Sequence, residues 1–222
     1  MTTTRPRRSI VGCAVIAATL VAAACGSDVD GVRGSGDVQT DERAVSGFDE
    51  ILLEGGASIV VDVSGTESLT IEADDNLLPL LTSDVVAGRL ELRTRESIAP
   101  SQPVVYTIDA VAFEGISIVG SGDLVATNLD CTSFDASIAG AGDLDLTGEC
   151  DRLDLSITGT GGFAGEAFEV ATADIDISGS GKVVVNASDE LVVRITGSGD
   201  VGYLGDPSTD IDIAGSGDVR KL

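Results

Sequence analysis

ISIVGSGD, residues 116–123, is the first of six copies of one phrase, in which apolar and polar residues alternate before Gly-x-Gly. The other copies are ASIAGAGD from Ala136, LSITGTGG from Leu155, IDISGSGK from Ile175, VRITGSGD from Val193 and IDIAGSGD from Ile211. The first glycines of successive copies lie 20, 19, 20, 18 and 18 residues apart. A period this regular indicates a repeat architecture.

Apolar residues occupy the same places in every copy. Isoleucine stands two residues before the first glycine each time, at Ile118, Ile138, Ile157, Ile177, Ile195 and Ile213. Apolar residues also stand four before and four after that glycine, and a polar residue separates the two columns that precede it. Alternation of this kind is typical of a half-buried strand. One such strand buries too little to be stable alone, so we expect the copies to stack into a β-solenoid.

The Gly-x-Gly that follows each strand supplies two residues that adopt positive φ readily, so the chain can turn a tight corner there. Equivalent positions of successive copies then lie side by side. This predicts an all-β, single-stranded, right-handed parallel β-helix with about 18–20 residues per coil in the C-terminal half. With strands about 4.8 Å apart, six coils form a rod roughly 30 Å long. A flexible Gly/Ser linker, the alternative, lacks apolar columns.

Strand signals continue without the Gly-x-Gly phrase between Ala44 and Ala110. The segments are FDEILLEGGASIVVDVSG from Phe48, ESLTIEAD from Glu67, GRLELRT from Gly88 and PVVYTIDA from Pro103. No linker separates them from Ile116, so we expect the first, less regular coils of one domain that spans 44–222. A helical turn is expected only at Asp74–Ser83.

The N-terminus has the features of an export signal. Three arginines precede an uncharged run from Ile10 to Ala24, which is short for a membrane span but suits the core of a signal peptide. Small residues lie directly before Cys25, as in a bacterial lipoprotein cleavage box. We therefore expect a signal peptide at 1–24, then a lipidated N-terminus and flexible tether at 25–43. Cleavage without lipidation and an uncleaved anchor are the alternatives.

The chain is strongly acidic, with 37 Asp and Glu against 13 Lys and Arg and a formal charge of −24. Loss of residues 1–24 removes three basic residues and no acid, so the charge becomes −27. Such a surface repels nucleic acid and anionic lipid headgroups, and we expect no nucleic-acid partner. The sequence contains no His, which excludes Ser-His and Cys-His nucleophiles.

The four cysteines fall into two groups. Cys13 and Cys25 belong to the expected signal and lipidation site, whereas Cys131 and Cys150 each lie nine residues before the first glycine of a copy. Stacked coils would bring the Cα atoms of the second pair about 5 Å apart, which is within disulfide range. A disulfide and two stacked buried thiols both fit that spacing. Two cysteines without His make a poor zinc site.

Acidic residues after Gly-x-Gly raise the question of calcium. The aspartates at this place in the repeat are Asp123, Asp143, Asp200 and Asp218. Gly162 and Lys182 occupy the same place in the third and fourth copies, and neither suits a ladder of calcium sites. We interpret the aspartates as turn caps, with calcium binding as the alternative, and we expect no metal or other cofactor.

Some β-helices cleave polysaccharides with paired carboxylates, so a hydrolase or lyase is the rival function. Asp74 and Asp75 are adjacent candidates, and an outward-facing column holds Asp135, Asp154, Asp174 and Asp210. Acid–base catalysis needs two carboxyl groups at a fixed distance in different environments. The column residues lie along an edge instead of converging, so the sequence favours a protein without catalytic residues.

The order of the segments resembles a known family. RAVSGFDEILLEGGASIVVDV, LTIEADDNLLPLL and GRLELRT come first, and repeated GSGD turns follow, all behind a signal that ends in cysteine. From Ala44 to Val219 this order is similar to the putative auto-transporter adhesin, head GIN domain family. The resemblance implies a right-handed β-helix on exported, often lipid-anchored bacterial proteins. It implies no catalytic or ligand-binding residues.

These observations predict an extracytoplasmic lipoprotein, held on the cell membrane by its N-terminal lipid at the cell surface or in the periplasm. The expected function is a non-catalytic binding, adhesion or structural module. An envelope polysaccharide or protein is the expected partner, met on the flat strand faces or on the loops between Gly88 and Pro103. A carbohydrate-active enzyme is the alternative. A calcium-dependent adhesive module is a third possibility, intermediate between a non-catalytic module without metal and the enzyme. The sequence leaves the oligomeric state open.

Overall fold

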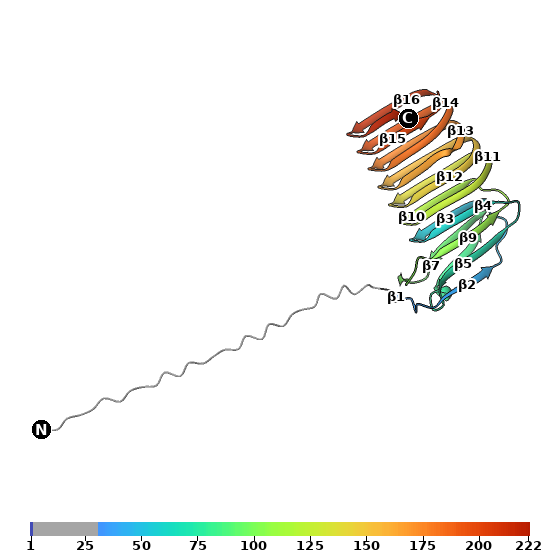
Figure 1. Cartoon of the computed structure of the whole chain (residues 1–222), viewed down its shortest axis with the longest axis vertical. Coiled ribbons are helices and arrows are strands. Elements are labelled where there is room, and N and C mark those ends of the chain that lie inside the picture. The colour runs from blue at the N-terminus through green and yellow to red at the C-terminus, as the bar shows by residue number, and fades with distance from the viewer. Residues whose placement is uncertain (2–30) are drawn as a thin grey trace.

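A stack of parallel β coils forms most of the molecule (Figure 1). The computed structural model describes Met1 and residues 31–222, so the expected signal peptide and Cys25 lie outside the described residues. The strands of the regular stack are β3 (Glu50–Gly55), β4 (Ser58–Val63), β10 (Gly115–Gly120), β11 (Asp123–Gly140), β12 (Asp143–Gly159), β13 (Gly162–Gly179), β14 (Lys182–Gly197), β15 (Asp200–Leu204), β16 (Ser208–Gly215) and β17 (Asp218–Lys221). The prediction of an all-β parallel solenoid is confirmed.

The isoleucine column is continuous through the stack. Strands β10 to β14 and β16 pair in parallel, and their registers place the following residues directly beside one another: Ile118, Ile138, Ile157, Ile177, Ile195 and Ile213. The first five are buried, whereas Ile213 in the last coil is 37% exposed. Each coil therefore buries the isoleucine of its neighbour, and the last coil has no neighbour beyond it among the described residues.

Glycine is required at the corners because successive coils touch there. Gly159 has a φ of 130°, in the left-handed region that L side chains rarely adopt. A Cβ atom on Gly159 would also overlap the carbonyl oxygen of Gly140 in the preceding coil. That oxygen accepts a hydrogen bond from the Thr160 N–H at 2.9 Å, so it cannot move away without loss of the bond. Backbone conformation and close approach thus both select glycine.

Strands β3 and β4 form one coil of the same stack, although they precede the first Gly-x-Gly copy. Gly55 pairs in register with Gly120, and the Ser121 N–H donates to the Gly55 carbonyl at 3.1 Å. Leu53 pairs with Ile118 and so extends the isoleucine column by one position. The repeat therefore begins one coil earlier than the six copies indicate.

Residues 64–114 are inserted between this coil and the next. They contain β5 (Ser68–Asp74), the 3₁₀ helix η1 (Leu78–Leu80), β6 (Leu81–Val86), β7 (Arg89–Thr94), β8 (Ile98–Ala99) and β9 (Val105–Ala110). β7 and β9 pair in parallel with β3 and β4 and extend the stack as predicted. The helical turn expected at Asp74–Ser83 is confirmed as η1.

The expectation that residues 44–110 form less regular coils is wrong for β5 and β6. Strand β5 is antiparallel to β9, and β6 is antiparallel to β7. The two residues between β6 and β7 are Ala87 and Gly88, with φ values of 52° and 86°. Positive φ at both positions is the conformation of a tight hairpin turn, which reverses the chain instead of continuing the coil.

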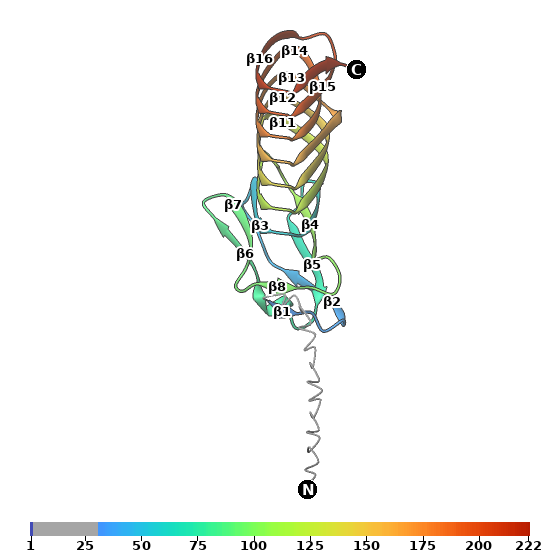
Figure 2. The same cartoon turned by 90° about the vertical axis from the view of Figure 1, so that its left-hand side faces the viewer.

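The N-terminal end of the stack is covered by residues that we expected in the tether. β1 (Val32–Arg33) pairs with β8, and β2 (Val38–Arg43) is antiparallel to β5. Figure 2 shows β1, β2, β5 and β8 together at the end of the molecule opposite to β16. Residues 32–43 of the expected tether are therefore part of the folded domain, and β2 supplies the hydrogen bonds that one edge of β5 would otherwise lack.

Three phenylalanine rings fill the interior where the regular coils begin. Phe134 lies between Phe113 and Phe168, with ring centroids 5.2 and 5.9 Å away in edge-to-face arrangements. All three are buried. Gly148 pairs in register with Phe168 and carries no side chain, which leaves room for the rings to meet. The three rings occupy different places in their coils, so the repeat pattern does not predict their contact.

Candidate functional site

Asp74, one of the two candidate catalytic acids, has a structural role. Its carboxylate is buried and accepts hydrogen bonds from Gly36 N–H at 2.8 Å, Ser101 N–H at 2.8 Å and Ser101 Oγ at 2.5 Å. The bonds from Ser101, followed by the bond from Gly36, hold the pKa of Asp74 below its usual value and outweigh the effect of burial. Asp74 thus ties the N-terminal segment and the segment after β8 to the end of β5.

Asp75 supports the same junction from outside. It is exposed, accepts a hydrogen bond from Ser35 Oγ at 2.5 Å, and its N–H donates to the Asp37 carbonyl at 2.9 Å. Both candidate carboxylates are therefore occupied by hydrogen bonds to the segment 34–37. The pair that the rival hydrolase needs is used to fasten the N-terminal end of the domain.

Replacement of Asp74 by Asn should loosen this junction at neutral pH. The new amide group would face backbone N–H donors that need an acceptor, so amide hydrogen exchange of residues 34–43 should speed up by roughly tenfold or more. Because the folded-state pKa is lowered from 3.8, the carboxylate stabilises the fold above about pH 4, and this contribution disappears as the pH falls through the folded-state pKa. The difference in Tm between wild type and variant should therefore be largest near neutral pH and vanish in acid.

Asp75→Asn is the matched control for this experiment. It changes a neighbouring exposed carboxylate that accepts a single long-range hydrogen bond, from Ser35. We expect a smaller change in exchange and a flatter dependence of Tm on pH. Equal behaviour of the two variants would contradict the assigned role of Asp74.

The acidic column on the outer face is partly neutralised. Asp135, Asp154 and Asp174 pair in register, but Val192 separates Asp174 from Asp210. Two of these aspartates form ion pairs with arginines. The Arg152 guanidinium donates to Asp154 at 2.6 and 2.7 Å, and Arg194 Nη1 donates to Asp174 at 2.8 Å. The hydrogen bonds to Asp154 also raise the pKa of Arg152. Dispersed, paired carboxylates of this kind form a solvated face.

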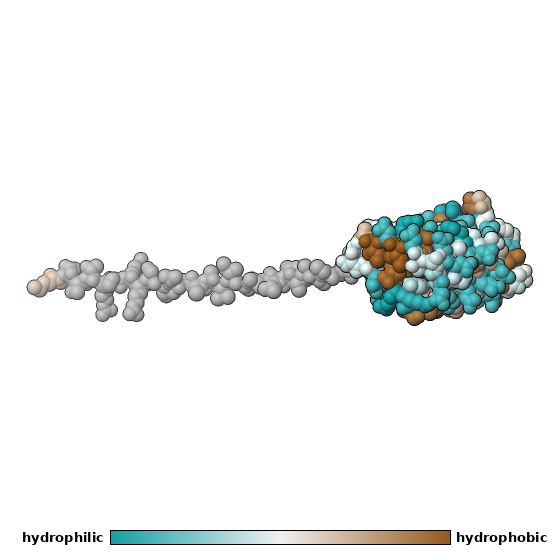
Figure 3. Space-filling model, turned by 90° about the horizontal axis from the view of Figure 1, so that it is seen from above, coloured by the Kyte–Doolittle hydropathy of each residue, from teal (hydrophilic) through white to brown (hydrophobic). Residues whose placement is uncertain are grey.

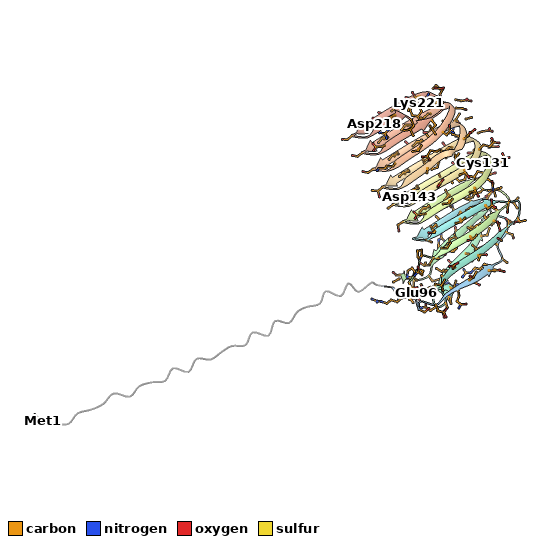
Figure 4. The ribbon with its side chains drawn as sticks, in the orientation of Figure 1. Met1, Glu96, Cys131, Asp143, Asp218 and Lys221 are labelled. Carbon is orange, nitrogen blue, oxygen red and sulfur yellow. A yellow bond between two sulfur atoms is a disulfide. The ribbon has the colours of Figure 1, made fainter. Side chains whose placement is uncertain are left out.

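The calcium candidates form two separate pairs. Asp123 and Asp143 are joined by a hydrogen bond from the Asp143 N–H to Asp123 Oδ1 at 3.1 Å, and Asp200 pairs in register with Asp218. Gly162 and Lys182 lie between the two pairs. Figure 4 shows Asp143 and Asp218 along one margin of the stack and Cys131 along the other. Among residues 31–222, no three His, Cys, Asp or Glu side chains are grouped in a way that could hold a metal ion.

The two cysteines of the solenoid meet as the repeat spacing predicts. Cys131 on β11 pairs in register with Cys150 on β12, their Cα atoms are 4.6 Å apart, and their sulfurs are joined in a disulfide. A crosslink across a loop of this length stabilises a fold by about 3 kcal/mol. The bridge borders an acidic groove of about 490 Å³, whose other lining residues include Asp130, Glu149, Asp151 and Glu169.

A second groove, also of about 490 Å³, has an apolar outer column. Val60 and Val125 pair in register and are 43% and 41% exposed, and Ala164 and Val184 continue the column beyond Asp145. The sequence analysis did not single out this column. The signal was present, because each of these residues lies one position after an inward-facing apolar residue of the repeat. Val60 and Val125 are exposed and Ala164 and Val184 are half-buried, so apolar side chains reach the surface along this face.

Within the described residues, no helix is long and apolar enough to cross a membrane. The aromatic side chains are withdrawn from the surface: all five Phe and Tyr106 are buried, and Tyr203 is half-buried. The outer faces of the described residues therefore carry few aromatic groups.

The stacked coils, with their structural Asp74 and open lateral grooves, define a β-solenoid protein. Residues 47–207 match the family described as "Putative auto-transporter adhesin, head GIN domain", and the chain belongs to this family. The resemblance predicted from the sequence is thereby confirmed. No curated protein matches the chain significantly.

Three solved structures have a similar fold. A putative adhesin from Bacteroides fragilis is 21% identical with a TM-score of 0.69, and it covers 86% of this chain and 100% of its own. A putative lipid binding protein from Parabacteroides distasonis is 22% identical with a TM-score of 0.55, at 87% and 100% coverage. A putative adhesin from Parabacteroides merdae is 17% identical with a TM-score of 0.54, at 87% and 99% coverage. At these identities the likeness concerns the fold alone.

Proposed function

We propose that the protein is a non-catalytic binding module that is exported and held on the cell envelope by a lipid on Cys25. The observation that carries this proposal is that the N-terminal segment and the last coil lie at opposite ends of the molecule. The chain enters the fold at residue 31 beside β8, whereas β16 and β17 form the opposite end (Figure 1). A lipid on Cys25 would therefore place the capped end toward the membrane and present the lateral faces and the last coil to the surroundings.

Family membership supports an adhesive role, and two similar structures are described as putative adhesins. The name of the lipid binding neighbour suggests another ligand class. The interior here is filled by the isoleucine column and the phenylalanine rings, so an acyl chain has no room between the coils. The loops between Gly88 and Pro103, which we expected to meet ligand, include β8 beside the N-terminal segment and would face the membrane. The lateral faces are thus the better binding surface.

A protein ligand fits these faces better than a polysaccharide. Sugar rings are commonly held by stacking on exposed aromatic side chains, and here the phenylalanines are buried. The exposed valines beside aspartates suit a partner with apolar and basic side chains. Since the carboxylates Asp74 and Asp75 hold the N-terminal segment, no observation favours the carbohydrate-active enzyme.

Replacement of Cys25 by Ser tests the anchor in a bacterial host. Serine cannot carry the thioether-linked lipid, so the Cys25→Ser chain should leave the membrane fraction almost completely and appear in the soluble extracytoplasmic fraction. Cys13→Ser, inside the expected signal, is the matched control and should stay with the membrane. Retention on membranes of a Cys25→Ser chain of mature length, from which residues 1–24 have been cleaved, would refute lipid anchoring.

The ligand test measures binding of the soluble Cys25→Ser chain to isolated envelopes. We expect the chain to bind. Digestion of the envelopes with protease should abolish binding, whereas periodate oxidation of their sugars should leave it intact. Added salt should weaken the binding, because an acidic surface meets a basic one. Loss of binding after periodate alone would favour a polysaccharide ligand, and release of reducing sugars would favour the enzyme.

A further inference from the structure

The last coil exposes groups that every earlier coil buries. β16 pairs only with β14, and β17 pairs only with β15, so one backbone edge of each strand has no partner among the described residues. The apolar residues Ile211 and Ile213 are 41% and 37% exposed, whereas Val193 and Ile195 beneath them are 0% and 2% exposed. Figure 3 looks onto the molecule from the side of this coil and shows hydrophobic patches among hydrophilic surface.

An unpaired edge with exposed apolar side chains is a template for another strand. We propose that the exposed edge of β16 and β17 binds the same edge of a second copy, so that two solenoids associate through their C-terminal coils. This inference does not depend on the ligand or the anchor of the proposed function.

The opposite end of the molecule explains why the copies would meet in this orientation. That end is closed by β2 and β6, which are antiparallel to β5 and β7, and its outermost strand β2 carries Asp41, Glu42 and Arg43. Charged side chains on an edge strand disfavour further strand addition. Head-to-tail growth into a filament is therefore disfavoured, whereas contact between two C-terminal edges closes as a two-fold dimer.

The charges of β17 complement those of a second copy. Asp218 and Arg220 flank Val219 on this strand. In a two-fold antiparallel pairing centred on Val219, Asp218 of each copy lies opposite Arg220 of the other. On β16, by contrast, registers that place Asp210 opposite Asp212 bring like charges together and are disfavoured. The charge pattern therefore selects β17 as the centre of the contact.

A second copy also fits the apolar part of the edge. In a pairing centred on β17, the interiors of the two stacks face each other, so Ile211 and Ile213 of each copy would lie over the interior of the other. The exposed side chain of Leu222, which is 54% accessible, lies on the same coil. Mutual burial of these residues supplies the hydrophobic contribution that the last coil lacks.

Sedimentation of the soluble Cys25→Ser chain tests the proposal over the micromolar range, free of any association through lipid. A concentration-dependent dimer is expected. Ile213→Lys should raise its dissociation constant by about tenfold or more, with circular dichroism and Tm showing that the solenoid remains folded. Val119→Lys, at a 49% exposed position on a lateral face, is the matched control and should leave dimerisation unchanged.

Charge reversal identifies the partner as a second copy. Asp218→Arg and Arg220→Asp should each weaken self-association, and a mixture of the two variants should restore it, because one chain then offers two cations and the other two carboxylates. The double variant Asp218→Arg/Arg220→Asp should also dimerise. A wild-type chain that stays monomeric throughout, a dimer that survives Ile213→Lys, or variants that fail to rescue each other would overturn the proposal.

Discussion

Gly159→Ala should destabilise the solenoid by about 3 kcal/mol or more. Two separate costs combine at this corner. The φ of 130° is strained for any residue with a side chain, and the added methyl group would overlap the Gly140 carbonyl oxygen that binds Thr160. Relief of the overlap requires the two coils to separate at the corner. For a domain of this size the expected fall in Tm is roughly 6–12 °C, measurable by circular dichroism.

Gly65→Ala separates these two costs. Gly65 also has positive φ, 82°, but nothing lies within 4 Å of a Cβ atom added there. Only the backbone strain of about 1 kcal/mol should remain, so this variant should lose a few degrees at most. If both variants lost the same stability, contact between stacked corners would not be the reason for the glycine column.

Phe134→Ala should cost about 3–5 kcal/mol. The ring is fully buried and touches both Phe113 and Phe168, so its removal leaves a cavity and deprives both neighbours of their edge-to-face contacts. The rest of the coil is fixed by strand pairing on both sides and cannot collapse into the space. Chemical denaturation of the purified soluble chain gives the change in the free energy of unfolding.

Phe134→Leu and Val119→Ala are the two controls for this measurement. Leucine keeps much of the buried volume, so its loss should be clearly smaller than that of alanine. Val119 is exposed, and its truncation should change stability by no more than about 0.5 kcal/mol. A Phe134→Ala variant as stable as Val119→Ala would show that the three rings do not hold the junction between the N-terminal coils and the regular repeat.

The regular part of the fold could be predicted because each copy of its repeat is a continuous segment of the sequence. The isoleucine column needs only local alternation and a constant period, and the pairing of Cys131 with Cys150 follows from the same period. The earliest coil could be predicted only as a less regular one, since its corner, Gly55-Gly56-Ala57, has alanine where the copies have the second glycine. A search for apolar residues four and two positions before a single glycine would have found Ile51 and Leu53.

The N-terminal cap could not be predicted in this way. β5 alternates like a solenoid strand, β2 carries a single apolar residue, and their antiparallel pairing depends on tertiary contacts. The role of Asp74 depends on Gly36 and Ser101, which lie 38 and 27 residues away. Its sequence context shows an acid beside another acid, which is equally compatible with catalysis and with a buried hydrogen-bond acceptor.

The insertion of residues 64–114 between β4 and β10 has a consequence for how a nascent chain acquires its shape. β3 and β4 are flanked on one side by β7 and β9 and on the other by β10 and β11, all of which are synthesised after them. The earliest coil is therefore paired on both sides only after Gly115, 65 positions downstream of its partner Glu50, has emerged. Coils can form one after another in chain order only from β10 onward. A chain exported with its N-terminus first would therefore remain exposed to aggregation or to quality-control proteases until β10 has emerged.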